Sequence, residues 1–141
     1  VPPPPGPAQS KGAGAIFPRG IMDKPIHLLT QGLALLLAAF FLFGAWGNLF
    51  LSPENEAAYA AWGYPGWFHY VTALCELVAA ILLARTATRP YGAGLGAAVM
   101  AAALLTTLIH GDYGHSAAPA VVLAVALVVL ALSLTHRPAT V

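Results

Sequence analysis

Residues 28–51 read LLTQGLALLLAAFFLFGAWGNLFL, a run of 24 residues without a charged side chain. At 1.5 Å of rise per residue, a helix of this length can cross the hydrocarbon core of a bilayer. Further apolar stretches follow at 68–84, 91–109 and 118–135, and the four together hold one formal charge, Glu76. Membrane strands would be shorter and would alternate in polarity. The pattern therefore predicts an all-α protein, an antiparallel bundle of four transmembrane helices.

The composition points to the same class of protein. Hydrophobic residues make up 59% of the 141-residue chain and charged residues 8%, whereas about 25% of a soluble domain is charged. Six cationic and five acidic side chains do not cover the surface of a soluble protein this apolar. The net charge of +1 excludes a nucleic-acid binder, which needs a basic patch. The single cysteine, Cys75, excludes a disulfide framework.

The segments that flank the spans indicate their orientation. We expect a short interfacial helix over 53–62, because Ser52 is a good N-cap and Pro53 suits the first helical position. All six cations fall on one side of the predicted bundle: Lys11, Arg19, Lys24, Arg85, Arg89 and Arg137. The positive-inside rule therefore predicts a multi-pass protein of a bacterial inner membrane with both termini in the cytoplasm.

The ends of the chain differ from the predicted transmembrane domain, residues 28–135. We expect residues 136–141 to form a short cytoplasmic tail. Residues 1–27 begin VPPPPGP and are too poor in apolar side chains to pack a core. We predict that residues 1–27 form an extended, Pro-rich arm that lies against a partner protein. The expected partner-binding residues are Pro2, Pro3, Pro4 and Pro5 of this arm, with Trp62, Tyr64 and Trp67 at the opposite, aromatic end of the bundle.

Glu76 is the most informative residue, because an ionisable group within a membrane span is costly and faces the bundle. His69, Thr72 and Glu76 recur at i, i+3 and i+7 and so share one helix face. A second polar stripe, which includes Thr106 and His110, lies at the end of the next predicted span, 91–109. The predicted intramembrane polar cluster comprises Glu76, His69, Thr72, Thr106, His110 and Asn48.

Three interpretations of this cluster remain open. Glu76 can be protonated and link helices by a hydrogen bond. It can instead accept a proton beside a quinol headgroup, with His69 or His110 passing the proton outward. A metal site is the third, using His110, Asp112 and His115, with His69 as an optional further ligand. The sequence requires no cofactor, although a quinone or a metal ion fits.

The residues around Glu76 also carry a family resemblance. The stretch GYPGWFHY, residues 63–70, runs into VTALCELVAAILL, residues 71–83. It resembles the DoxX and DoxX-like membrane proteins, in which a G-x-P-x-W turn precedes a second helix bearing Glu-Leu. The resemblance extends over about residues 28–135 and implies a four-helix fold. It also implies association with membrane redox systems such as thiosulfate:quinone oxidoreductase.

These observations favour a non-catalytic accessory subunit of a larger respiratory or photosynthetic membrane complex. In that case the partners are the lipid bilayer and other membrane subunits. One alternative is a quinone-interacting subunit of an oxidoreductase, in which Glu76 and His110 handle protons. A further alternative is a small transporter, against which the absence of an inverted repeat argues. No residue is predicted to be catalytic.

Overall fold

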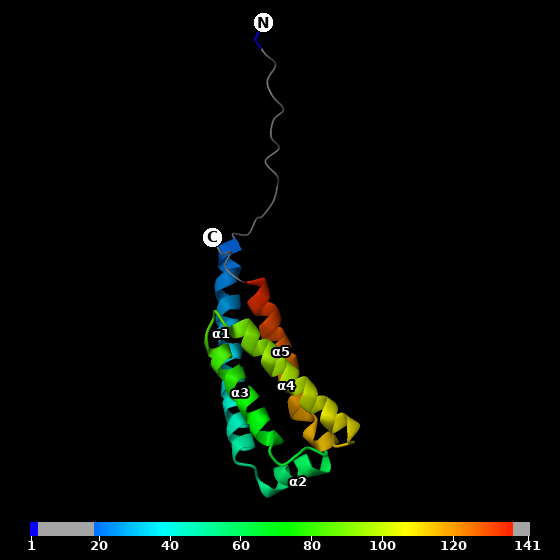
Figure 1. Cartoon of the computed structure of the whole chain (residues 1–141). Coiled ribbons are helices and arrows are strands. Elements are labelled where there is room, and N and C mark those ends of the chain that lie inside the picture. Colours follow the sequence, from blue (N-terminus) through cyan, green and yellow to red (C-terminus); the bar gives the residue numbers. More distant parts are fainter. Residues whose placement is uncertain (3–18, 137–141) are drawn as a thin grey trace.

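The computed structural model describes residues 1–2 and 19–136, and every regular element among them is helical (Figure 1). The prediction of an all-α protein is therefore confirmed for this part of the chain. The elements are α1 (Arg19–Leu49), α2 (Pro53–Ala61), α3 (Phe68–Ala84), α4 (Arg89–Ile109), the 3-10 helix η1 (Tyr113–His115) and α5 (Ala117–Thr135).

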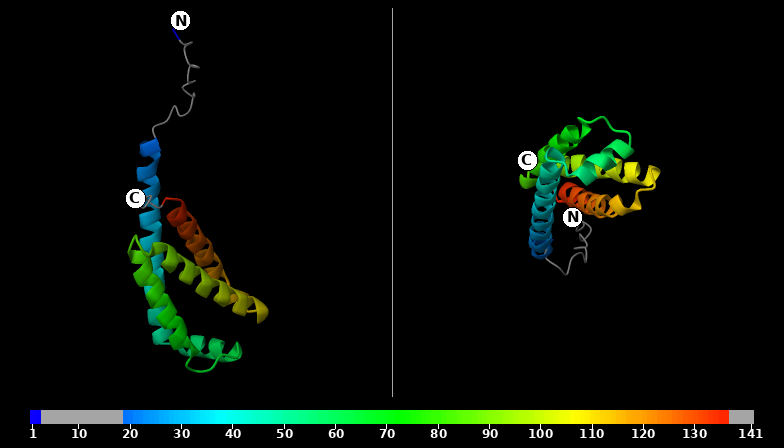
Figure 2. Two further views of the ribbon diagram at one scale, coloured as in Figure 1. Left: turned by 45° about the horizontal axis from the view of Figure 1, so that its top comes forward. Right: turned by 90° about the horizontal axis from the view of Figure 1, so that it is seen from below.

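The four long helices pack in chain order as neighbours. Helix α1 packs along α3, α3 packs against α4, and α4 packs against α5. We call the end at which α1 begins and α5 ends the basal end, and the opposite end the distal end. Helix α2 runs across the distal end (Figures 1 and 2). The ring of Trp62, directly after α2, lies 5.8 Å from the ring of His115, between α4 and α5.

Within the described part of the chain, three helical segments are long and apolar enough to cross a membrane: Gly20–Leu49, Arg89–Ile109 and Tyr113–Thr135. Helix α3 is also apolar, but it has 17 residues. That number is at the short limit for a span. A fourth crossing, by α3, stays a prediction, as does the cytoplasmic placement of the basal end.

Small residues allow the helices to approach closely in the core. A Cβ atom placed on Gly92 would lie 2.6 Å from Leu83 N and 2.9 Å from Ala79 O, so the backbones of α4 and α3 nearly touch. One turn further along α4, Gly96 leaves room for the fully buried ring of Phe41. Such close approach is how membrane helices gain packing energy without a hydrophobic driving force.

The observed helix bounds differ from the predicted ones mainly at the start of α1. This helix begins at Arg19, so residues 19–27, predicted as part of the arm, are helical. Pro25 is tolerated because its missing N–H leaves only the carbonyl of exposed Ile21 without its helical partner. Helix α4 likewise begins at Arg89, two residues before the expected span. Pro2 is exposed, whereas Pro3, Pro4 and Pro5 lie outside the described residues.

The interfacial helix forms as its end signals indicate. Ser52 caps α2, because its Oγ accepts a hydrogen bond from Asn55 N at 3.2 Å, and Pro53 occupies the first turn. The helix ends at Ala61, and the turn that follows places Gly63 at φ +80°. A glycine adopts this left-handed conformation at no steric cost. The turn brings Tyr64 back over the distal end of the bundle.

Candidate functional site

The carboxyl group of Glu76 lies inside the bundle and not on its lipid-facing surface. The side chain is 4% exposed, and Asn48 Nδ2 of α1 donates a hydrogen bond to Glu76 Oε2 at 2.9 Å. The same Nδ2 also lies 3.2 Å from Gly44 O. Among the described residues, no hydrogen bond engages Glu76 Oε1 and no cation lies within ion-pair distance of the carboxyl group.

Gly44 makes this placement possible. A Cβ atom on Gly44 would lie 2.8 Å from Glu76 Oε1 and 2.9 Å from Glu76 Oε2. Such distances are shorter than any real van der Waals contact, so a larger residue would displace the carboxyl group. The space at this glycine thus accommodates a polar side chain of the neighbouring helix, and not that helix's backbone.

Asn48 connects Glu76 to the interfacial helix. Its Oδ1 accepts a hydrogen bond from Tyr59 OH of α2 at 2.7 Å, and its backbone carbonyl accepts one from His69 Nδ1 at 2.6 Å. The amide of Asn48 therefore accepts from α2 and donates to Glu76 on α3. Burial raises the pKa of the Tyr59 phenol above its usual value, so the phenol remains a donor. We call Tyr59, Asn48 and Glu76 the polar relay.

A second hydrogen bond joins the α2–α3 loop to α4. Tyr64 OH and Thr106 Oγ1 lie 2.6 Å apart, and the ring of Tyr64 stacks on Phe68 with a centroid distance of 4.2 Å. This bond fixes the loop against α4. It also gives the hydroxyl group of Thr106 a hydrogen-bond partner outside α4.

These groups surround a cavity of about 430 Å³ at the distal end. Helices α1, α3 and α4, with η1 and the first turn of α5, form its wall, and α2 with its following loop covers it. The lining is mainly apolar and aromatic. Its polar members include Asn48, Tyr59, Tyr64, Thr72, Glu76 and Thr106. A mostly apolar cavity of a few hundred Å³ with a few convergent polar groups is the usual form of a small-molecule site.

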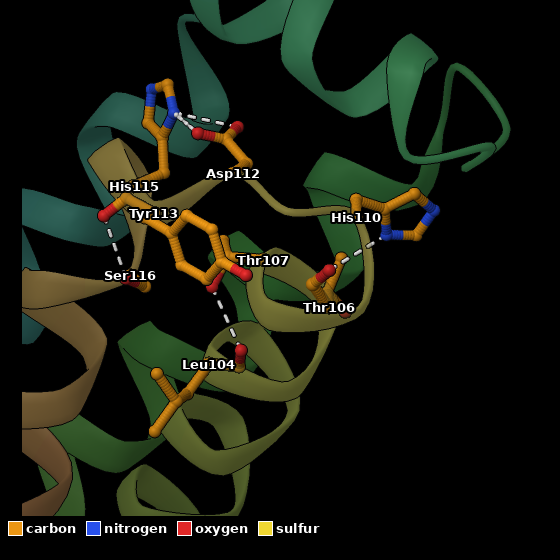
Figure 3. A network of polar contacts seen from close by, with 8 residues as sticks. All are labelled: Leu104, Thr106, Thr107, His110, Asp112, Tyr113, His115 and Ser116. Carbon is orange, nitrogen blue, oxygen red and sulfur yellow. Dashed lines mark hydrogen bonds and ion pairs between the residues drawn. The ribbon is translucent and has the colours of Figure 1, made fainter.

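The structure brings together five of the six residues of the predicted polar cluster. Asn48, Thr72, Glu76 and Thr106 line the distal cavity, and His69 holds the backbone of Asn48. His110 does not join them. Its side chain is exposed, and its Nδ1 donates back to Thr106 O at 2.8 Å (Figure 3). His110 is thus not among the residues that line the cavity with Glu76.

The structure brings together two of the three main predicted metal ligands, Asp112 and His115, but not His110. His115 Nδ1 lies 2.9 Å from Asp112 Oδ1, whereas the ring of His110 points to the other side of the loop (Figure 3). Within residues 1–2 and 19–136, no group of three or more His, Cys, Asp or Glu side chains is placed to hold a metal ion. The hydrogen bond from His115 lowers the pKa of the Asp112 carboxyl group. Asp112 and His115 therefore form a local loop contact.

The predicted partner-binding aromatic residues divide into two groups. Trp62 and Tyr64 line the distal cavity, whereas Trp67 is 61% exposed on the surface. Sequence reasoning missed Tyr59, which completes the polar relay from the short interfacial helix. Tyr59 is the seventh residue of α2 and the one aromatic residue of a helix whose other side chains are small or polar. That contrast is the signal in the sequence that could have identified it.

Comparison with known proteins identifies the family of the chain. The model of the DoxX-like family matches residues 32–129, which is more than half of the chain and includes the whole of α3 and α4. Neither the curated proteins nor the solved structures contain a match. The chain is therefore an integral membrane protein that belongs to the DoxX-like family.

Proposed function

We propose that this chain is a membrane subunit that binds the headgroup of a quinone in the distal cavity. The observation that carries the proposal is the buried carboxyl group of Glu76 on the wall of a cavity of about 430 Å³. That volume lies within the range of small-molecule sites, about 300–1,000 Å³. An ionisable residue inside a membrane bundle is by default a candidate functional group.

The unengaged atom of Glu76 supports a ligand rather than a purely structural role. Asn48 engages Oε2, whereas Oε1 has no hydrogen bond among the described residues. A buried carboxylate without a cationic partner is strongly unfavourable, so in this proposal Glu76 carries a proton on Oε1. A protonated carboxyl group is a hydrogen-bond donor. A quinone carbonyl is the complementary acceptor, and the aromatic lining suits the flat ring.

The test uses a short-chain ubiquinone, because quinones quench tryptophan fluorescence and Trp62 lines the cavity. Purified protein in detergent should show saturable quenching. Glu76→Gln keeps a donor in the same place and should retain most of the affinity. Glu76→Leu removes it and should weaken binding about tenfold, the value of one hydrogen bond to a buried polar group.

Two further variants guard against misfolding and non-specific quenching. Thr72→Val removes a hydroxyl group from the cavity wall while keeping the side-chain shape, and should also weaken binding. Tyr70→Phe is the matched control, because Tyr70 is exposed and does not line the cavity. Quenching that does not saturate, or equal affinities for Glu76→Leu and Tyr70→Phe, would refute the proposal.

A second candidate role is that of an accessory subunit in a larger bacterial bioenergetic complex of the inner membrane. Large aromatic side chains exposed near the distal end support it: Trp46, Trp67 and Tyr70. Aromatic residues are enriched at protein interfaces as well as at membrane surfaces. Purification of the tagged protein in a mild detergent tests this role. Co-migration of redox or pigment subunits is expected, and recovery of the chain alone would contradict it.

A further inference from the structure

A second cavity, of about 810 Å³, lies at the basal end, remote from Glu76. It lies between the first turns of α1, the connection between α3 and α4, and the last turns of α5. The polar side chains that line it include Lys24, His27, Thr86, Arg89 and Ser133. Nothing in the proposed quinone site uses these residues.

Arg89 is the unusual member of this cavity. It is 2% exposed, and its guanidinium donates only to neutral acceptors. Nε lies 3.5 Å from Leu83 O, Nη2 lies 3.4 Å from Thr86 Oγ1, and Nη2 also donates to Gln31 Oε1. Among the described residues, no carboxylate lies within 4.0 Å of Arg89 and no hydrogen bond engages Nη1. A guanidinium is always charged and this one is buried, so an unpaired state is strongly unfavourable.

Lys24 of α1 adds a second cation to the cavity, and it forms no ion pair with any described residue. Asp23 is the one carboxylate among the described residues that line the cavity. Ser133 Oγ of α5 is buried and has no hydrogen-bond partner among the described residues. A buried hydroxyl group without a partner is uncommon and calls for an explanation. A guanidinium of α4 and an ammonium group of α1 thus line one cavity.

We propose that the basal cavity binds a phosphate group, with Arg89 as its buried anchor and Lys24 as a second cation. Phosphate oxygens accept several hydrogen bonds at once, and the planar guanidinium matches them in pairs. The bound charge would neutralise Arg89. Two sources share this chemistry: the headgroup of an anionic phospholipid and free phosphate.

Native mass spectrometry of the full chain in detergent tests the lipid source, with phosphatidylglycerol and phosphatidylcholine as probes. Both lipids carry a phosphate, but phosphatidylcholine adds a choline cation that Arg89 and Lys24 repel, so we expect phosphatidylglycerol to bind about tenfold more tightly. Arg89→Gln should abolish this preference. Lys24→Gln should reduce it, and because Lys24 is exposed this variant keeps the fold. Arg85→Gln is the matched control, since Arg85 is an exposed cation of the same connection outside the cavity.

Inorganic phosphate tests the other source. If it raises the thermal stability of the wild type but not of Lys24→Gln, while the lipid preference is absent, the site is assigned to free phosphate. The proposal is overturned if neither probe distinguishes the wild type from Lys24→Gln. It is also overturned if Arg85→Gln loses as much phosphatidylglycerol preference as Lys24→Gln, since the attraction would then be a general surface charge effect.

Discussion

The close contact between α3 and α4 gives the sharpest stability prediction. A Cβ atom on Gly92 would lie 2.6 Å from Leu83 N, which is 0.8 Å inside the 3.4 Å limit of ordinary contact. Its second neighbour, Ala79 O at 2.9 Å, is also backbone. Backbone atoms of a packed helix do not move alone, so Gly92→Ala must push the two helices apart.

The magnitude follows from two opposing effects. Overpacking of a well-packed site costs about 1–3 kcal/mol, and a clash with backbone on two sides belongs at the upper end. Replacing glycine by alanine inside a helix stabilises it by about 1 kcal/mol. We therefore expect Gly92→Ala to lower the free energy of unfolding by about 1–2 kcal/mol.

Gly94→Ala provides the matched control on the same helix. A Cβ atom there has no heavy atom within 4 Å, so only the propensity gain of up to about 1 kcal/mol applies. Reversible unfolding by sodium dodecyl sulfate in mixed micelles, followed by circular dichroism, measures both variants. If Gly92→Ala is as stable as Gly94→Ala, the helices are not as close as described and the reasoning fails.

Three further predictions concern the distal end. Ser52→Ala removes the cap of α2 and should lower stability by about 1 kcal/mol, measured by thermal unfolding. Tyr59→Phe removes the hydrogen bond to Asn48 and should lower the free energy of unfolding by about 1 kcal/mol in the micelle assay; an unchanged value would contradict the polar relay. The hydrogen bond from His115 lowers the pKa of Asp112. The contact therefore stabilises the loop at pH values above the usual aspartate pKa, and this contribution is lost as the pH falls through the lowered pKa. Asp112→Asn should remove that pH dependence in amide hydrogen exchange of the loop.

The fold was largely predictable from the sequence, because long apolar stretches and cap residues are local signals. Residues 68–84 were expected as a span and are helical throughout, and Ser52 and Pro53 marked the start of α2. The start of α1 was not predictable in this way. Pro25 resembles a helix breaker, and only the structure shows that the lost hydrogen bond falls on an exposed turn.

The candidate site was predictable only in part, since contacts between helices depend on their rotation. The spacing of Thr72 and Glu76 on one face predicted that both point inward, and both line the distal cavity. The spacing gave no information about His110, which lies at the helix end and turns back to its own backbone. Tyr59 and the buried Arg89 were missed, because their roles arise from residues distant in the chain.

The contact between Gly44 and Glu76 links two positions that are 32 residues apart in the sequence. A carboxyl group on α3 fits only while α1 carries no side chain at the facing position. We expect the two positions to co-vary among relatives, so that a larger residue replaces this glycine only where the acid is replaced by a shorter or smaller residue. Substitution of either one alone would leave a steric overlap or an empty space between the helices.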